Sequence, residues 1–249
     1  MPDCVGIDQS TTASEASLAF AKSKLGQAPA FWGRYFKTAG NTDPAQYQSG
    51  RESSFFNTHQ IRVLPIGRQT PNVSKADRDL GFGDGQDNAA AVIGSFGAPH
   101  LSPMPEVAVF LDAEINNPLH HLYFRGWSDG LIAGGNADPA NPVKFVPCLY
   151  AHHNDGQSWG ELGKAIAAGA VCGAAWIVFM DSKKFPVGPW QPARFTGKNM
   201  PDGVRVAVAQ RILDLADAHK RTYDFNLANP AHQDWLLPRL VLPAAPPVS

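Results

Sequence analysis

The stretch PEVAVFLDAEIN, residues 105–116, places two carboxylates directly after a run of apolar side chains. A short, nearly continuous apolar run is typical of a strand that is buried on both faces. Residues i and i+2 of a strand point to the same side, so Asp112 and Glu114 are expected to share one face, with their Cα atoms about 6–7 Å apart. This segment therefore predicts a buried strand that ends in an acidic pair.

Further apolar runs alternate with longer segments that carry helical spacing or helix-ending residues, a pattern typical of βα units. The expected strands are Val5–Asp8, Phe31–Phe36, Ile61–Ile66, Val107–Leu111, Phe145–Tyr150, Ala174–Phe179, Val204–Gln210 and Thr222–Leu227. The expected helices are Thr12–Leu25, Pro44–His59, Gly85–Phe96, Pro118–Ile132 and Trp159–Ala168. This order predicts one α/β domain over residues 1–249, a single (β/α)8-type barrel.

The last third of the chain lacks this alternation. Residues 181–202 are rich in Pro and Gly and show no helical period. The segment RILDLADAHKR, residues 211–221, is compatible with a short helix or with a loop and a turn. We therefore expect helices to be missing or irregular in this part of the barrel. The core is expected to cover about residues 4–228, and the proline-rich tail, residues 229–249, to extend over the surface.

Composition and charge exclude several classes of partner. The 21 basic and 22 acidic residues give a net charge of -1 without a basic cluster, so nucleic acid is not an expected partner. No apolar run approaches the roughly 18 residues that span a bilayer. Because the N-terminus lacks the pattern of a signal peptide, we expect a cytoplasmic protein as synthesised, with any export by a non-classical route or a secretion system. Cys4, Cys148 and Cys172 are expected to be buried thiols.

Acidic residues fall where a barrel would use them. Catalytic groups of eight-stranded barrels lie at the C-terminal ends of the strands. Asp8 ends the first expected strand and Asp224 lies in the eighth, which is its neighbour in a closed barrel. With Asp112 and Glu114 across the mouth, four acids are expected around one cavity. For Asp8 alone, capping of the first helix is a competing interpretation.

Such a cluster suits cleavage of a glycosidic bond. One carboxylic acid protonates the leaving oxygen, while a carboxylate stabilises the cationic transition state or activates water. Like charges and an apolar approach both favour the protonated form of one member. We therefore expect Glu114 to donate the proton and the other acids to be ionised.

Four short motifs occur in an order that resembles a known family: GID at residues 6–8, GRYF at 33–36, LDAE at 111–114 and YDFN at 223–226. They resemble the glycoside-hydrolase-like domain of unknown function that is related to the family 25 lysozymes (muramidases). The similarity runs from about Val5 to Asn226. It implies an eight-stranded barrel that acts on bacterial cell-wall peptidoglycan, with Glu114 as the general acid beside the other three acids, and it implies neither a cofactor nor a metal.

The resemblance also implies substrate-binding positions. Tyr150 matches an aromatic residue that faces the cleft, and Trp176 matches a sugar platform. For Trp176 a place in the core is the competing interpretation, because aromatic residues in barrels more often belong to the core. Arg34 and Tyr35 match an R-Y pair, with Arg34 as a partner for the carboxylates. Gln210 matches a glutamine at the end of the seventh strand. The residues after Asp8, QSTTASEAS, lack the Q-G pair of the lysozymes, so the uncharacterised group is the closer relative.

Two other functions stay open. A non-catalytic barrel that binds a glycan or a partner protein could keep the same acidic cleft. Hard divalent cations also favour carboxylate oxygens, which would suit phosphoester cleavage, although Arg34 is the sole basic residue expected near the acids.

Two pairs of adjacent histidines do not have a chelating spacing. His120 and His121 are expected on a helix surface. His152 and His153 follow the fifth expected strand at the barrel mouth, where contact of one of them with a ligand is an alternative to a purely structural role.

Overall fold

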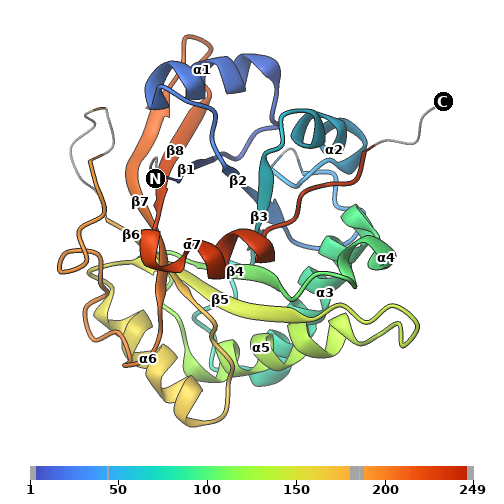
Figure 1. The fold of residues 1–249 in the computed structure, drawn as a ribbon. Coiled ribbons are helices and arrows are strands. Elements are labelled where there is room, and N and C mark those ends of the chain that lie inside the picture. The colour runs from blue at the N-terminus through green and yellow to red at the C-terminus, as the bar shows by residue number, and fades with distance from the viewer. Residues whose placement is uncertain (1–3, 44, 180–184, 186–187, 246–249) are drawn as a thin grey trace.

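The computed structural model describes residues 4–43, 45–179, 185 and 188–245. Its centre is a closed barrel of eight strands in sequence order (Figure 1). The strands are β1 (Val5–Asp8), β2 (Phe31–Phe36), β3 (Arg62–Gly67), β4 (Val107–Ala113), β5 (Phe145–His152), β6 (Ala175–Val178), β7 (Val206–Ala216) and β8 (Thr222–Ala228). The prediction of an α/β barrel is confirmed. Pro44, the first residue of an expected helix, and most of residues 181–187 lie outside the described residues.

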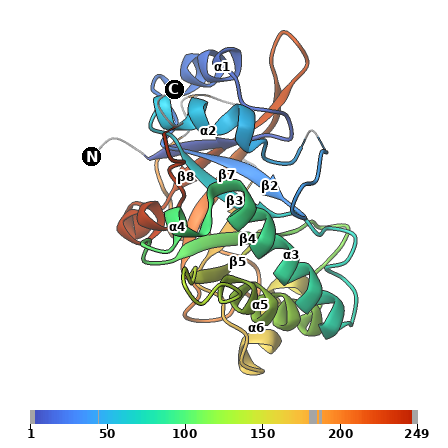
Figure 2. The ribbon, with the colours of Figure 1, turned by 90° about the vertical axis from the view of Figure 1, so that its right-hand side faces the viewer.

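Helices surround the barrel on the side of its first six strands. They are α1 (Glu15–Leu25), α2 (Ser49–Thr58), α3 (Arg78–Phe96), α4 (Ala98–Leu101), α5 (His121–Gly135) and α6 (Gly156–Ala167). Figure 2 shows α5 and α6 below the strands, α3 running diagonally beside β4 towards α5, and α1 and α2 in the upper part of the view. Within the described part of the chain, no helix follows β6 or β7, in agreement with the expected irregular last third.

Helix α3 begins at Arg78 rather than at Gly85, because Asp77 caps it by accepting a hydrogen bond from the Leu80 N–H at 2.9 Å. The glycines that disfavour a helix in the sequence serve packing instead. A Cβ at Gly81 would lie 2.2 Å from the Tyr123 carbonyl oxygen, and one at Gly130 would lie 2.0 Å from that of Phe82. The glycines therefore allow the backbones of α3 and α5 to touch.

The seventh and eighth strands form an antiparallel hairpin. Strand β7 continues through Ala216, so most of RILDLADAHKR is strand rather than helix or loop. Strand β8 pairs antiparallel with β7 and with β1, whereas the other neighbouring strands pair in parallel. Asp214 has a φ of 51° where the register between the two strands shifts. This bulge directs the end of the hairpin past the rim of the barrel.

The tail does not simply extend over the surface. The side chains of Leu236 and Leu240 are fully buried in the cluster that fills the barrel, together with Phe31 and Phe110. Short helices η1 (Pro230–His232), α7 (Gln233–Leu236) and η2 (Leu237–Arg239) place them there. Figure 1 shows α7 lying across the barrel. The segment WLLPRLVL, residues 235–242, thus closes the end of the barrel opposite the acids. Removing its leucine side chains from water lowers the free energy of the folded chain.

Candidate functional site

A cavity of about 370 Å³ opens at the carboxyl ends of the parallel strands. All four acids expected to meet there line it: Asp8, Asp112, Glu114 and Asp224. Its other lining residues are Gln9, Ser10, Tyr35, Ala113, Ile115, Tyr150, His152, Val178, Leu213, Asp214 and Thr222. The convergence of the acids, and the placement of Tyr35 and Tyr150 beside them, agrees with the sequence prediction.

The antiparallel direction of β8 explains how Asp224 reaches this cavity. Asp224 lies near the start of β8, directly opposite Asp8 on β1. Opposite residues of an antiparallel pair point to the same face, with Cβ atoms about 5 Å apart. Ser14, not Asp8, caps helix α1 by accepting a hydrogen bond from the Ser17 N–H. Asp8 is therefore free of the capping role that its position in the sequence also allowed.

Burial and neighbouring negative charges keep a proton on the Asp8–Asp224 pair. Burial first, and then the charge of Asp224, raise the pKa of Asp8 well above its usual range. The Asn226 side chain opposes this rise by donating a hydrogen bond to Asp8 Oδ2 at 2.7 Å. Burial also raises the pKa of Asp224 to about 6, although the Asp214 backbone N–H donates to Asp224 Oδ1 at 2.7 Å. The two carboxyl groups therefore hold one proton between them near neutral pH and carry a single negative charge, contrary to the expectation that both are ionised.

The acidic pair on β4 divides between the floor and the rim of the cavity. Asp112 is 4% exposed, and burial followed by the charge of Glu114 raises its pKa to about 7. The Thr70 hydroxyl donates to Asp112 Oδ2 at 3.1 Å and offsets part of this rise. Glu114 is exposed, because β4 ends at Ala113 and the chain then leaves the barrel. Desolvation by the apolar strand, which we expected at Glu114, therefore acts on Asp112.

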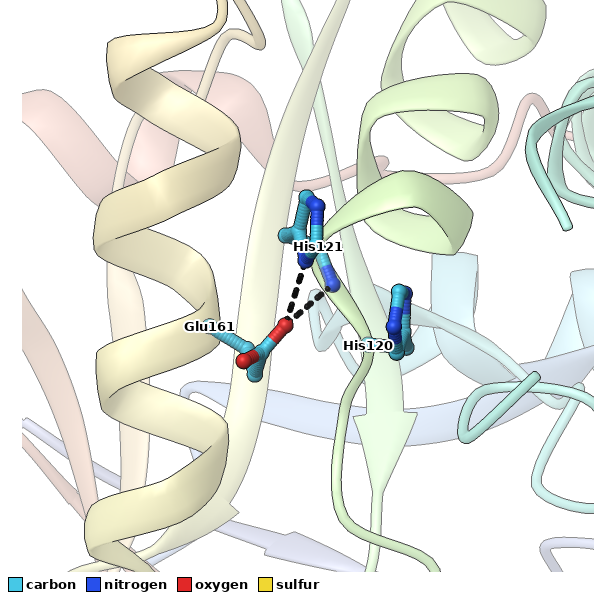
Figure 3. Close-up of side chains that lie close together, drawn as sticks. All are labelled: His120, His121 and Glu161. Atoms are coloured by element: carbon cyan, nitrogen blue, oxygen red, sulfur yellow. Dashed lines mark hydrogen bonds and ion pairs between the residues drawn. The ribbon is translucent and has the colours of Figure 1, made fainter. Parts of the chain in front are cut away.

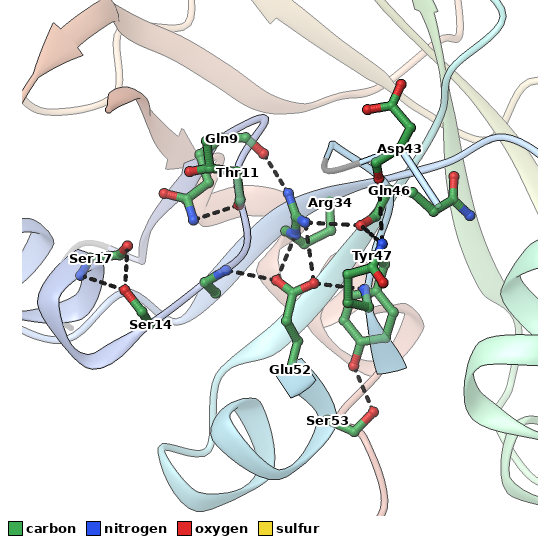
Figure 4. Close-up of polar contacts among 12 residues, drawn as sticks. Gln9, Thr11, Ser14, Ser17, Arg34, Asp43, Gln46, Tyr47, Glu52 and Ser53 are labelled. Carbon is green, nitrogen blue, oxygen red and sulfur yellow. Dashed lines mark hydrogen bonds and ion pairs between the residues drawn. The ribbon is translucent and has the colours of Figure 1, made fainter. Parts of the chain in front are cut away.

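Arg34 does not contact the cavity acids, which corrects its expected role. Tyr35 points into the cavity, so its neighbour in the strand points outward. The Arg34 side chain is fully buried there and donates to Glu52 through Nε at 2.8 Å and Nη2 at 3.2 Å (Figure 4). It also donates to the Gln9 carbonyl at 2.7 Å. Arg34 thus fixes the loop after β1 to helix α2.

Trp176 is not a sugar platform, because it is fully buried inside the barrel and does not line the cavity. Its indole N–H donates to Asn226 Oδ1 at 3.0 Å, and Asn226 in turn donates to Asp8. Its ring packs edge-on against Tyr150, with centroids 4.8 Å apart. Trp176 therefore supports the floor of the site and orients Asp8 through Asn226.

Gln210 also lies below the cavity rather than in its wall. It is fully buried, and neither of its amide atoms completes a hydrogen bond within the described residues. Its side chain nevertheless approaches Asp224 closely enough to lower the pKa of that acid in part. Gln210 is thus a neighbour of the acid pair, without direct access to a ligand in the cavity.

Several site residues are missing from the sequence prediction. Asp214 lines the cavity as a fifth acid, but it belongs to a segment whose secondary structure the sequence leaves open. Gln9 also lines it, and the buried Gln9 Oε1 has no hydrogen-bond partner among the described residues. Thr70 and Arg68 come from the loop directly after β3. Their position just past the end of a strand would have predicted that they lie at the mouth of the barrel.

The two histidine pairs have different surroundings. His152 lines the cavity, as allowed by its place after the fifth strand, whereas His153 packs against Phe179 at a centroid distance of 4.5 Å. His120 and His121 lie at the start of α5. Burial is the first cause that lowers the pKa of both His152 and His153.

His120 and His121 approach Glu161 of α6 (Figure 3). Among the described residues, these three are the one group of His, Cys, Asp or Glu whose possible metal ligands lie within 4.8 Å of one another. Glu161 already accepts from His121 Nδ1 at 2.6 Å and from the Lys164 ammonium at 2.5 Å. A metal here would have to displace these donors. The cavity acids do not form such a group within the described chain.

Comparisons with known proteins reveal relatives of the fold. No family model and no curated protein matches the chain. An uncharacterized protein of B. stearothermophilus is 19% identical and superposes with a TM-score of 0.67, over 95% of this chain and 99% of that chain. The Mycobacterium tuberculosis Tat-secreted protein Rv2525c, solved in complex with L-tartrate, is 10% identical with a TM-score of 0.51, over 93% and 98% of the two chains. At these identities the two structures support the fold over its whole length.

No helix in the described residues is both long enough and apolar enough to cross a membrane.

Proposed function

We propose that this chain is a glycoside hydrolase-like protein that acts on bacterial cell-wall peptidoglycan. The observation that carries the proposal is the meeting of acids from β1, β4 and β8 around one cavity, with a floor acid, Asp112, whose pKa is raised to about 7. Hydrolysis of a glycosidic bond near neutral pH requires both protonated and ionised carboxyl groups around the same bond. The resemblance of the GID, LDAE and YDFN motifs to the lysozyme-related domain supports this substrate class.

Glu114 is the proposed proton donor to the leaving oxygen. It lies at the rim beside the exposed Ile115, where a glycan chain crossing the mouth would cover it. A glycan in this position would bring its glycosidic oxygen within reach of the Glu114 carboxyl. As the glycosidic bond breaks, the Glu114 proton moves to the leaving oxygen. The departing sugar therefore leaves as an alcohol.

The remaining acids act on the sugar whose anomeric carbon loses the leaving oxygen. The Asp8–Asp224 pair lies across the mouth from β4, where its negative charge stabilises the oxocarbenium-like transition state. A water molecule then adds to the anomeric carbon and gives up a proton to the ionised member of this pair. The pair releases that proton to solvent, and Glu114 takes one up from solvent, which restores the starting state. Asp112, which carries a proton near neutrality, donates a hydrogen bond to the substrate from the floor. Tyr35 and Tyr150 provide apolar walls for the sugar ring.

The test is the release of reducing ends from purified bacterial walls. The wild-type chain is expected to release them, and Glu114→Gln is expected to lower the rate by at least about a hundredfold, the usual contribution of a general acid. Asp202→Asn is the matched control, because Asp202 is exposed and lies outside the cavity. Circular dichroism confirms that each variant is folded. Equal rates for Glu114→Gln and the control would refute the assignment of Glu114.

Two other outcomes separate the alternatives. Binding of wall fragments without release of reducing ends by the wild-type chain would identify a non-catalytic glycan-binding barrel. Loss of activity in EDTA, with recovery on addition of magnesium or manganese, would identify a metal-dependent enzyme. Our proposal predicts that EDTA leaves the rate unchanged.

A further inference from the structure

Strand β7 bulges opposite Asp224 of β8. The register between the two strands shifts twice, between Gln210 and Ile212 and again between Ile212 and Leu215. Within β8, Asp224 has no residue of β7 in register with it. Bulges are frequent beside functional sites, where they turn a side chain or a backbone group towards the site. This part of β7 is therefore placed to act on the acids of the cavity.

Two consecutive residues of the bulge, Leu213 and Asp214, line the cavity. Neighbouring residues of a regular strand point to opposite faces, so an undistorted β7 would place only one of them there. Asp214 has a φ of 51°, in the left-handed region that residues with a side chain rarely adopt. Such a conformation costs free energy and persists where the surrounding structure imposes it, which is common at functional sites. The strain of β7 is thus concentrated at the wall of the cavity.

The backbone N–H of Asp214 has an unusual acceptor. Gln60 and Lys220 also have positive φ, and each donates its N–H to the carbonyl oxygen three residues earlier, as in an ordinary turn. The Asp214 N–H donates instead to the side chain of Asp224, at 2.7 Å from Oδ1. A hydrogen bond to an ionised acceptor is shorter and stronger than one between neutral groups. The left-handed conformation therefore takes this N–H out of the β7–β8 ladder and turns it to an acid of the site.

Asp214 affects the ionisation of both acids of the pair. Burial is the main cause that raises the pKa of Asp8 and of Asp224, and the charge of Asp214 adds to both rises. The Asp214 N–H opposes the rise of the Asp224 pKa, because it stabilises the ionised carboxylate. The other titratable groups that line the cavity are Tyr35, Asp112, Glu114, Tyr150 and His152. Among the described residues neither Lys nor Arg lines it, so at Asp224 a backbone N–H takes the place of a cation.

We propose that Asp214 is a positioning residue: its left-handed conformation aims its backbone N–H at Asp224 Oδ1 and holds this carboxylate in the cavity opposite Asp8. Asp224 is then the ionised member of the pair and, in the proposed hydrolysis, takes the proton of the attacking water. The role of Asp224 in turnover rests on the proposed function. The hydrogen bond and its effect on titration are independent of any substrate, so they are tested separately.

Carbon-13 NMR of the aspartate carboxyl groups measures the titration of the pair in the free protein. Asp214→Asn removes the charge but keeps the N–H in place, since Asn tolerates positive φ. Asp214→Val is equally uncharged, but its β-branched side chain disfavours this conformation and turns the N–H away. The lower apparent pKa of the pair is expected to fall in Asp214→Asn, because a neighbouring negative charge is gone. In Asp214→Val the pair is expected to bind this proton about tenfold to a hundredfold more tightly than in Asp214→Asn, the range of a hydrogen bond to a charged group.

The wild-type protein supplies a measurement that needs no variant. Because the Asp214 N–H donates to Asp224, its amide signal should shift as the pH passes through the lower apparent pKa of the pair. An Asp214 signal that does not follow the pair would overturn the proposal, whether or not Asp214→Val folds. Equal titration of the pair in Asp214→Asn and Asp214→Val would overturn it too and leave the proposed function standing.

Release of reducing ends connects the hydrogen bond to turnover. At the optimum pH of each variant, Asp214→Val is expected to be on the order of tenfold to a hundredfold slower than Asp214→Asn, the cost of a displaced reacting group. The rise of its rate on the acid side of the pH profile should lie at higher pH than in Asp214→Asn. Lys220→Val is the matched control and should keep the wild-type rate, because Lys220 has a φ of 61° in the turn of the same hairpin and does not line the cavity.

Two further outcomes separate this role from general damage and from the proposed function. A loss of rate in Lys220→Val as large as that in Asp214→Val would overturn the proposal, because it would trace the loss to the hairpin as a whole. If the pair titrates as expected but the wild-type chain releases no reducing ends, the proposed function fails, while the role of Asp214 in holding Asp224 is supported.

Discussion

Replacement of Asp112 by asparagine is expected to stabilise the fold at neutral and alkaline pH. Burial, followed by the charge of Glu114, raises the pKa of Asp112 from 3.8 to about 7. A rise of this size corresponds to about 4 kcal/mol of unfavourable free energy when the group is ionised in the folded chain. The carboxamide that Asp112→Asn introduces is nearly the same size as the carboxyl group, stays neutral and can still accept the hydrogen bond that Thr70 donates.

The sign of the pH dependence follows from the raised pKa. Between about pH 4 and about pH 7 the folded chain keeps a proton on Asp112 that the unfolded chain has lost, so wild-type stability falls as the pH rises through this window. Asp112→Asn removes this dependence. The variant should match the wild type near pH 4 and exceed it by up to about 4 kcal/mol at pH 8. This value is an upper limit, because the other cavity acids share the repulsion.

Urea unfolding at pH 4.5 and pH 8, followed by tryptophan fluorescence and circular dichroism, measures the effect. Equal slopes against urea ensure that the comparison concerns stability rather than compactness. Asp202→Asn, an exposed change outside the cavity, should match the wild type in stability at both pH values. A variant that gains nothing at pH 8, or that differs from the wild type equally at both pH values, would refute the assignment of a desolvated, protonated acid to the cavity floor.

Three further predictions concern the scaffold. Arg34→Met leaves the Glu52 carboxylate buried without its cation and should lower the free energy of unfolding by about 3–5 kcal/mol. The double variant with Arg34→Met and Glu52→Met should regain most of this loss. If Arg34→Met leaves the free energy of unfolding unchanged but abolishes glycan binding, Arg34 contributes to ligand binding instead. Gly130→Ala should lower the free energy of unfolding by about 1–3 kcal/mol, because the added Cβ would lie 2.0 Å from a carbonyl oxygen. The matched change Gly83→Ala places its Cβ where no atom lies within 4 Å, so it should leave that free energy unchanged or raise it. Urea unfolding measures both effects. Partial burial raises the pKa of Glu161, but hydrogen bonds from its neighbours outweigh burial and lower the pKa to about 2. The ionised Glu161 therefore stabilises the folded chain above about pH 4.5, and this stabilisation is lost as the pH falls towards 2. The melting temperatures of the wild type and of Glu161→Gln should therefore converge in acid.

Parts of the site follow from the sequence because they depend on local pattern. Alternation along β4 places Asp112 inside the barrel, and the end of an apolar run marks the rim where Glu114 lies. The same alternation, applied to β2, would have turned Arg34 outward once Tyr35 was placed inside. The expectation for Arg34 was wrong because it relied on a motif match rather than on strand geometry.

Other parts depend on which elements meet. Trp176 has the residue type of a sugar platform, but its depth in the barrel decides that it packs beneath the cavity. The glycines of α3 are helix breakers in isolation, and the facing backbone of α5 makes them necessary. The direction of β8 cannot be read from the alternation of its side chains. It is nevertheless the antiparallel direction of β8 that sets Asp224 opposite Asp8.

The sequence by itself determined the α/β class, most of the strands and the residues that end them, because periodicity and residue type act over a few neighbouring positions. Only the tertiary structure decided which acid is desolvated, which arginine stands beside the cavity and how the leucines of the tail close the barrel. Burial and Coulomb interactions depend on distances between groups, and folding brings Asp8 next to Asp224 and Arg68 next to Tyr35 although they are remote in the chain.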